Sequence, residues 1–83
     1  MTLNLVYTIV KISPDLSCDI LGAFENEKVA IHYLTNHINT EYNLKESTNH
    51  RVYQRSESTF EVHVVGYLTK CLLCKYHIVQ INL

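Results

Sequence analysis

The residues best suited to chemistry are three cysteines and one histidine. Cys71 and Cys74 have C-x-x-C spacing, and His77 follows three residues later. Together with Cys18 they would form a set of three thiolates and one imidazole, which is a known ligand shell for structural zinc. The sequence therefore offers one candidate metal site, which depends on whether the fold brings these four residues together.

The residues between the two cysteines argue against zinc. A chelating C-x-x-C needs a tight turn, whereas Leu72 and Leu73 favour a strand, in which positions three apart face opposite sides. A thioredoxin-like redox pair would need a helix directly after Cys74, and none is expected there. We therefore expect no cofactor. Two of the cysteines should be small buried hydrophobic residues, and the third should lie at the surface.

Five histidines could serve as general bases, but no catalytic motif accompanies them. His32 and His37 are five residues apart on a predicted helix, which is the wrong spacing for one shared metal, and HExxH is absent. There is no G-x-S-x-G motif, and Gly22 and Gly66 alone cannot form a glycine-rich phosphate loop. The sequence predicts that the protein is not an enzyme and has no evident small-molecule substrate.

Basic and aromatic residues in the second half of the chain point to an alternative function. Residues 43–83 carry five Lys or Arg residues against three Glu. A single-stranded nucleic acid could stack on such a sheet face and pair its phosphates with the cations. However, an RNP-type motif is missing and few cations are available for phosphate contacts. The residues that would carry this alternative are Arg51, Tyr53, Arg55 and Lys75.

Length and composition indicate one domain spanning residues 1–83. The chain has 83 residues, 47% of them hydrophobic and 18% charged, which is a globular balance. The net charge of −1 does not attract the chain to a membrane surface, and no apolar run approaches the roughly 18–20 residues of a membrane span. An odd number of cysteines, and the lack of a basic residue before Lys11, favour an intracellular, cytoplasmic location.

The hydrophobic pattern predicts the element order β-β-α-β-β-β. Residues 3–13 are apolar on both alternating faces, so this strand should be central in its sheet. A turn at Pro14 and Asp15 leads to a second, antiparallel strand over Asp19–Phe24, in which Gly22 indicates a bulge or a close backbone approach. The only helix is expected over Glu25–Asn43, because Ala30, Leu34 and Ile38 recur on one face.

Three more strands should follow a polar loop at Leu44–His50. We expect an α+β domain with one helix packed on a mostly antiparallel four- to five-stranded sheet. The turn at Ser56–Thr59 and the short connection at 68–70 should each close a hairpin. The predicted strands are Arg51–Arg55, Phe60–Tyr67 and Leu72–Leu83.

A single helix can cover only one face of this sheet. Both faces of the last strand are apolar, so more apolar groups are present than one helix can cover. We expect a homodimer, or another protein partner, on the open face or at a strand edge. In the alternative, the 44–50 loop and the strand ends fold over that face. The predicted interaction surface comprises Tyr53, His63, Val65, Tyr67 and Tyr76.

Three segments have a familiar order: VYTIVKI, DILGAFENEKVAIHYL and GYLTKCLLCKYHIVQI. In this order the chain resembles small uncharacterised proteins of large double-stranded DNA viruses, which have an opening strand, a return strand into a Glu/Lys-rich helix, and a closing hairpin. The resemblance spans most of the chain and rests on no catalytic motif. It implies an accessory or virion-associated protein, in host cytoplasm or virion, with no active-site residues to carry over.

Overall fold

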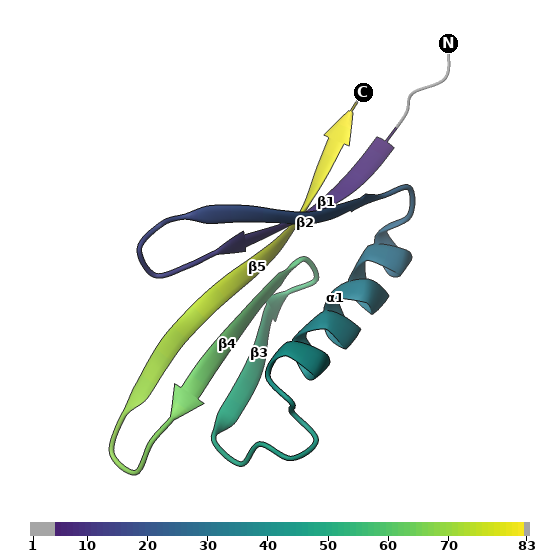
Figure 1. Cartoon of the computed structure of the whole chain (residues 1–83). Helices are drawn as coiled ribbons and strands as arrows, with labels where there is room; N and C mark the ends of the chain where they lie inside the picture. The colour runs from purple at the N-terminus through teal and green to yellow at the C-terminus, as the bar shows by residue number, and fades with distance from the viewer. Residues whose placement is uncertain (1–4, 83) are drawn as a thin grey trace.

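The structure, a computed structural model, describes residues 5–82 as one helix beside a five-stranded antiparallel sheet (Figure 1). The strand order in the sheet is β2-β1-β5-β4-β3. The α+β class and the predicted element order are confirmed, while Leu3 and Leu83 lie outside the described residues. The elements are β1 (Leu5–Ile12), β2 (Cys18–Phe24), α1 (Glu27–Glu41), β3 (His50–Ser56), β4 (Thr59–Val65) and β5 (Lys70–Asn82).

The long central strand β5 joins two hairpins into one sheet. Its residues 70–77 pair with β4, and its residues 75–82 pair with β1. The β1–β2 hairpin therefore lies along one half of β5 and the β3–β4 hairpin along the other (Figure 1). The first strand was predicted to be central. β1 lies between β2 and β5 and is not an edge strand, but β5 occupies the centre of the sheet.

The sheet contains a β-bulge next to Gly22. Ile9 pairs with Gly22 and Val10 pairs with Ile20, so Leu21 is the extra residue on β2. A Cβ atom on Gly22 would lie 3.2 Å from the Phe24 ring, which is tighter than ordinary contact. Of the two alternatives predicted for this glycine, the bulge is present, and the close neighbour is a side chain rather than backbone.

Helix α1 is shorter than its predicted span and has a defined cap at each end. The Asn26 side chain accepts a hydrogen bond of 2.7 Å from the Lys28 amide, so the helix begins at Glu27. At the other end Asn43 adopts the left-handed conformation (φ 49°), and the Leu44 amide donates to the Asn39 carbonyl. This is a Schellman-type ending, and it directs Leu44 back toward the core.

The core lies between α1 and one face of the sheet. Ala30, Leu34 and Ile38 are all buried, as the four-residue spacing predicted. The helix lies against β1, β2 and β5, and none of the described residues of β3 or β4 approaches it as closely. The buried apolar residues are Ile9, Ala30, Leu34, Ile38, Phe60, Val62, Cys74, Tyr76 and Ile78.

Strands β3, β4 and β5 differ from prediction mainly at their ends. β4 ends at Val65, two residues before the predicted end, and residues 66–69 form the loop to β5. Tyr67 therefore lies in a hairpin loop and is 99% exposed. The loop closes with a hydrogen bond of 2.7 Å from the Gly66 amide to the Thr69 carbonyl. Within residues 5–82 no helix is long and apolar enough to cross a bilayer.

Candidate interaction surface

The pairing register assigns the sheet side chains to two faces. Residues directly opposite each other in an antiparallel pair point to the same side of the sheet. Ile9 lies opposite Ile78, and both are buried on the side of α1. The alternate residues of the same strands, such as Thr8 and Val79, consequently point to the face that has no helix. We call this the helix-free face.

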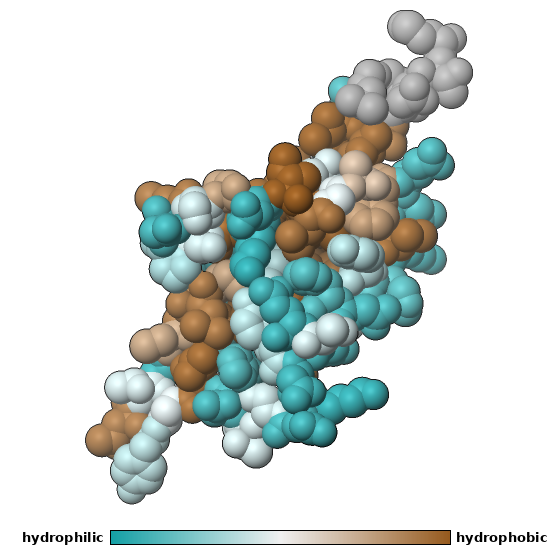
Figure 2. Space-filling view, viewed as in Figure 1, coloured by the Kyte–Doolittle hydropathy of each residue, from teal (hydrophilic) through white to brown (hydrophobic). Residues whose placement is uncertain are grey.

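One half of the helix-free face is mainly apolar, with Thr8 and His77 among its aliphatic residues. On it, Val10 lies opposite Ile20. Ile20 is 73% exposed, and Val79 and Ile81 on β5 are 43% and 40% exposed. Figure 2 shows hydrophobic surface at the end of the molecule where β1 begins and β5 ends. We call these residues the apolar strip, namely Val6, Val10, Ile20, Val79 and Ile81.

The other half of the helix-free face is charged and is organised by Glu61. The Nε atom of Arg55 donates to Glu61 Oε1 over 3.0 Å, and His63 Nε2 lies 2.9 Å from the same oxygen. Lys75 Nζ lies 3.8 Å from Oε2. The hydrogen bonds from His63 and Arg55 lower the pKa of Glu61 to about 2. We call this group, with Tyr53 and Lys70, the Glu61 cluster.

Tyr53 lies between cations in this cluster. Arg55 is the extra residue of a β-bulge, since Gln54 pairs with Phe60 and Ser56 with Thr59. Its guanidinium carbon lies 4.9 Å from the centre of the Tyr53 ring, and Lys70 Nζ lies 4.0 Å from it. Both positions are cation–π geometry. The Tyr53 ring is therefore already in contact with two cations of the same chain.

His63 is the most buried member of the Glu61 cluster. It is 8% exposed, and its ring meets Tyr53 edge to face with centroids 5.0 Å apart. Nε2 faces Glu61, while the enclosed Nδ1 has no hydrogen-bond partner among the described residues. An enclosed polar nitrogen without a partner carries a desolvation cost. The His63 ring is held by its contact with Tyr53 and by the Nε2 bond to Glu61 despite this cost at Nδ1.

Four of the five predicted interaction residues lie on the helix-free face or in the loop at its end. Tyr53, His63 and Val65 are on the helix-free face, and Tyr67 is in the loop at its end. The placement of Tyr76 was wrong. It is fully buried on the α1 side, because it pairs with Phe60 and shares the face of the core.

Tyr76 instead joins the sheet to the end of the helix. Its hydroxyl donates to Glu41 Oε2 over 3.1 Å. Lys11 Nζ and His37 Nε2 also bind Glu41, at 3.0 and 2.8 Å. Burial is the largest cause that raises the pKa of Tyr76, and its hydrogen-bond interactions with Tyr42 and Cys74 raise this pKa as well. Tyr76 is therefore a neutral structural residue, and the sequence pattern gave no sign of its partners.

The residues of the nucleic-acid alternative do share one face, as predicted, but most of their charge is engaged. Arg51 donates from Nη1 to the Thr48 and His50 carbonyls at 3.1 and 2.9 Å. Arg55 and Lys75 both face the Glu61 carboxylate. Lys70 was not among the predicted residues, although it lies over the Tyr53 ring from the far end of the β4–β5 hairpin.

The cysteines differ from prediction in two ways. Cys74 alone is buried, while Cys18 and Cys71 are exposed, so one cysteine rather than two belongs to the core. Cys71 pairs with Val64 and Cys74 with Val62, which leaves Leu73 as an extra residue in the strand. This bulge places both cysteines on the same face, contrary to the argument from strand alternation.

The proposed zinc ligands are nevertheless dispersed. Cys74 accompanies Tyr42 in the core, with 3.1 Å between its sulfur and the tyrosine hydroxyl oxygen. His77 points to the helix-free face and lies 3.2 Å from the Thr59 hydroxyl. Within residues 5–82, no three His, Cys, Asp or Glu side chains are grouped as metal ligands would be. These residues therefore form no site that could hold zinc.

Comparison with known proteins adds no relative to this picture. No protein-family model matches the chain, and no match was found among curated proteins or among solved structures. The function must therefore be argued from the helix-free face and its surroundings.

Proposed function

We propose that this protein is a non-enzymatic interaction module that associates with a second copy of itself through the apolar strip. The observation that carries the proposal is the exposure of Ile20, Val79 and Ile81 on a sheet face that no other element covers. An accessory or virion-associated role, as implied by the viral resemblance, forms part of this proposal.

The energetics favour covering the strip. Complete burial of one large aliphatic side chain is worth roughly 1.5–3 kcal/mol. Burial of the three partly exposed residues against a second copy would therefore contribute favourably to association. The loop after α1 does not cover them, since Leu44 packs into the core on the other face. A two-fold symmetric pair would place each strip against its copy, with the same residues supplied by both chains.

The test compares two charged substitutions in otherwise identical chains. Val79→Asp lies in the strip, whereas Val29→Asp lies on the outer side of α1 and is similarly exposed at 53% against 43%. Native mass spectrometry of the wild type should show twice the 9.6 kDa chain mass. Val79→Asp should shift the mass to monomer while Val29→Asp does not. A monomeric wild type at high micromolar concentration would refute the proposal.

The cations of the Glu61 cluster favour a second candidate function, the binding of single-stranded nucleic acid. Arg55 and Lys70 lie over the Tyr53 ring. Arg51 and Lys75 lie on the same face, and Glu61 is the carboxylate among these cations. Such a surface could follow a phosphate backbone, although Glu61 already neutralises part of its charge.

This second candidate has its own measurement. Fluorescence anisotropy of a labelled oligothymidine should show binding that weakens steeply with salt, because counterions are released on phosphate contact. Lys70→Glu should abolish the binding, whereas Lys28→Glu, on the helix, should not. Absence of binding at low salt would remove this candidate and leave self-association unaffected.

A further inference from the structure

A groove separates α1 from the edge strand β3 on the face opposite the apolar strip. The helix residues Glu27, Ile31, Thr35 and Ile38 recur at helical spacing and line its length. At one end lies a cavity of about 190 Å³ between Ile38, Leu44, Val52 and Phe60, among others. At the other lies a larger, open cavity of about 610 Å³ bounded by Tyr7, Glu27, Gln54 and Glu57. The groove therefore has an apolar end and an acidic end.

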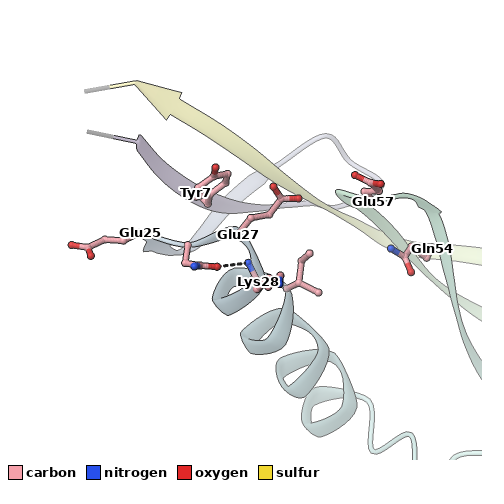
Figure 3. A pocket seen from close by; sticks show the side chains of 8 residues that line it. Tyr7, Glu25, Glu27, Lys28, Gln54 and Glu57 are labelled. Carbon is pink, nitrogen blue, oxygen red and sulfur yellow. Dashed lines mark hydrogen bonds between the residues drawn. The ribbon is translucent and has the colours of Figure 1, made fainter. Parts of the chain in front are cut away.

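Figure 3 shows how the acidic end is built. Glu27 and Glu57 reach the opening from different elements, the helix and the β3–β4 turn, while Glu25 points away. None of these three carboxylates has an ion-pair partner within residues 5–82. Lys28 is the single cation among the lining residues. The opening therefore has complementary charge for a basic side chain.

The rim of the groove presents unpaired backbone groups. In an antiparallel strand the N–H and C=O of one residue point to the same side, and that side alternates along the chain. The His50 amide donates to Ser47 Oγ and its carbonyl accepts from Arg51, so both point away from β4. Val52 and Gln54 point the same way, and among the described residues nothing pairs with their N–H and C=O groups.

A second copy of β3 is a poor fit for this edge. To use all four open groups, two copies would have to pair antiparallel about Tyr53, with Val52 opposite Gln54 of the other chain. That register places Arg51 directly opposite Arg55, and like charges in directly opposed positions destabilise a strand pair. The edge therefore favours a different partner, with acidic residues on the helix-free side.

We propose that the groove binds an extended peptide segment of another protein, which adds to the sheet as a sixth strand beside β3. The peptide runs antiparallel to β3 and reads, from its N-terminus, basic residue, any residue, large aliphatic residue, acidic residue. The basic residue lies opposite Gln54, within reach of Glu27 and Glu57. The aliphatic residue lies opposite Val52 and fills the cavity beside Ile38.

The acidic residue of the peptide provides a check on the register. It lies opposite Arg51, whose side chain is exposed on the helix-free side of the same strand. Main-chain hydrogen bonds supply part of the affinity, and the alternating side chains supply the selectivity. The surface is separate from the apolar strip, so this proposal and the proposed self-association can fail independently.

The probe is a synthetic, end-capped ten-residue peptide containing Lys-Thr-Leu-Glu in its centre, titrated into the isotope-labelled full chain. Amide resonances of Val52 and Gln54 should shift most, with smaller shifts at Ile38 and Leu44. Arg51→Glu should weaken binding about tenfold, and a peptide with Lys in place of its Glu should restore it. Gln54→Pro removes one edge donor and should weaken binding at least fivefold, whereas Gln54→Ala retains the donor and should bind nearly as the wild type does.

Three results would overturn the proposal. They are no binding at millimolar peptide, equal binding of a peptide with the central residues in reverse order, and shifts confined to the apolar strip. A dispersed amide spectrum for each variant shows that the domain is still folded, so loss of binding is not mistaken for unfolding. The oligomeric state, measured by mass in the same samples, reports separately on self-association.

Discussion

Two glutamates in this domain have similar neighbours but different roles. Glu41 at the end of α1 binds a lysine, a histidine and a tyrosine that come from β1, the helix and β5. Glu61 on β4 binds an arginine from β3, a histidine from β4 itself and a lysine from β5. The Glu41 group lies where the helix meets the sheet, and the Glu61 cluster lies on the helix-free face.

Each glutamate binds a lysine, a histidine and one further side chain, but the two groups connect different parts of the fold. Lys11 and Tyr76 are 30 and 35 residues from Glu41, so their bonds attach the helix to the sheet. Arg55 and His63 are six and two residues from Glu61 and are already aligned by strand pairing. Loss of the first carboxylate should loosen an element, whereas loss of the second should rearrange side chains on an intact sheet.

The largest expected effect comes from removing the tyrosine of each group. Tyr76→Ala empties a fully buried site and should cost about 3–5 kcal/mol, close to the whole stability of a domain of this size. Tyr53→Ala should cost less, about 1 kcal/mol, because the contacts it removes lie on a face that no helix covers. These contacts are with His63, Arg55 and Lys70. Urea denaturation followed by circular dichroism measures both, and equal losses would contradict the comparison.

Replacing each glutamate by glutamine should show that only Glu41 attaches the helix to the sheet. Glu41→Gln should cost about 1 kcal/mol, since charge-assisted hydrogen bonds are lost from a side chain that is 34% exposed. Its clearer signature is faster amide hydrogen exchange in the last two turns of α1, measured by mass spectrometry. Glu61→Gln should leave exchange in α1 unchanged. Faster helix exchange in both variants would show that the two groups are coupled.

Acid should act mainly through the Glu61 cluster. The pKa of Glu61 is lowered from 4.5 to about 2 in the folded chain, so the unfolded chain binds this proton first as the pH falls. Its stabilising contribution is present above about pH 5 and is lost as the pH falls toward 2. Glu61→Gln should flatten the decrease in thermal midpoint over this range, and an unchanged slope would contradict the assignment.

The smallest expected difference concerns the two lysines. Lys75 lies 3.8 Å from Glu61 and is 42% exposed, so Lys75→Ala should change stability by no more than about 0.5 kcal/mol. Lys11 lies 3.0 Å from Glu41 and is 20% exposed, so Lys11→Ala should cost more, about 1 kcal/mol. Thermal denaturation at low and high salt compares them, and a reversed order would contradict the role given to Glu41.

The regular elements could be predicted because their patterns are local. The spacing of Ala30, Leu34 and Ile38 indicated the helix and its buried side, and Gly22 indicated the bulge in β2. The ends were less predictable. The helix begins after the Asn26 cap and ends at Glu41, before the left-handed Asn43. Both ends depend on backbone angles that several residues could have adopted.

The candidate site was only partly predictable, because β-bulges change which face a residue takes. The extra residue Leu73 moves Cys71 to the face of Cys74, and the bulged Arg55 is placed to meet Glu61. These two bulges arise from the pairing of two strands and have no signal in the sequence of either one, unlike the bulge in β2, which Gly22 indicated. For the same reason, the groove between α1 and β3 could not be inferred from any single segment.

The sequence by itself determined the element order, the single helix and the excess of apolar side chains over what that helix can cover, because these follow from periodicity and composition. Only the tertiary structure decided which apolar residues remain exposed. Tyr76 and Val79 lie three apart on one strand and were equally available to the core. The register of β5 and the side on which α1 packs buried the first and left the second on the surface.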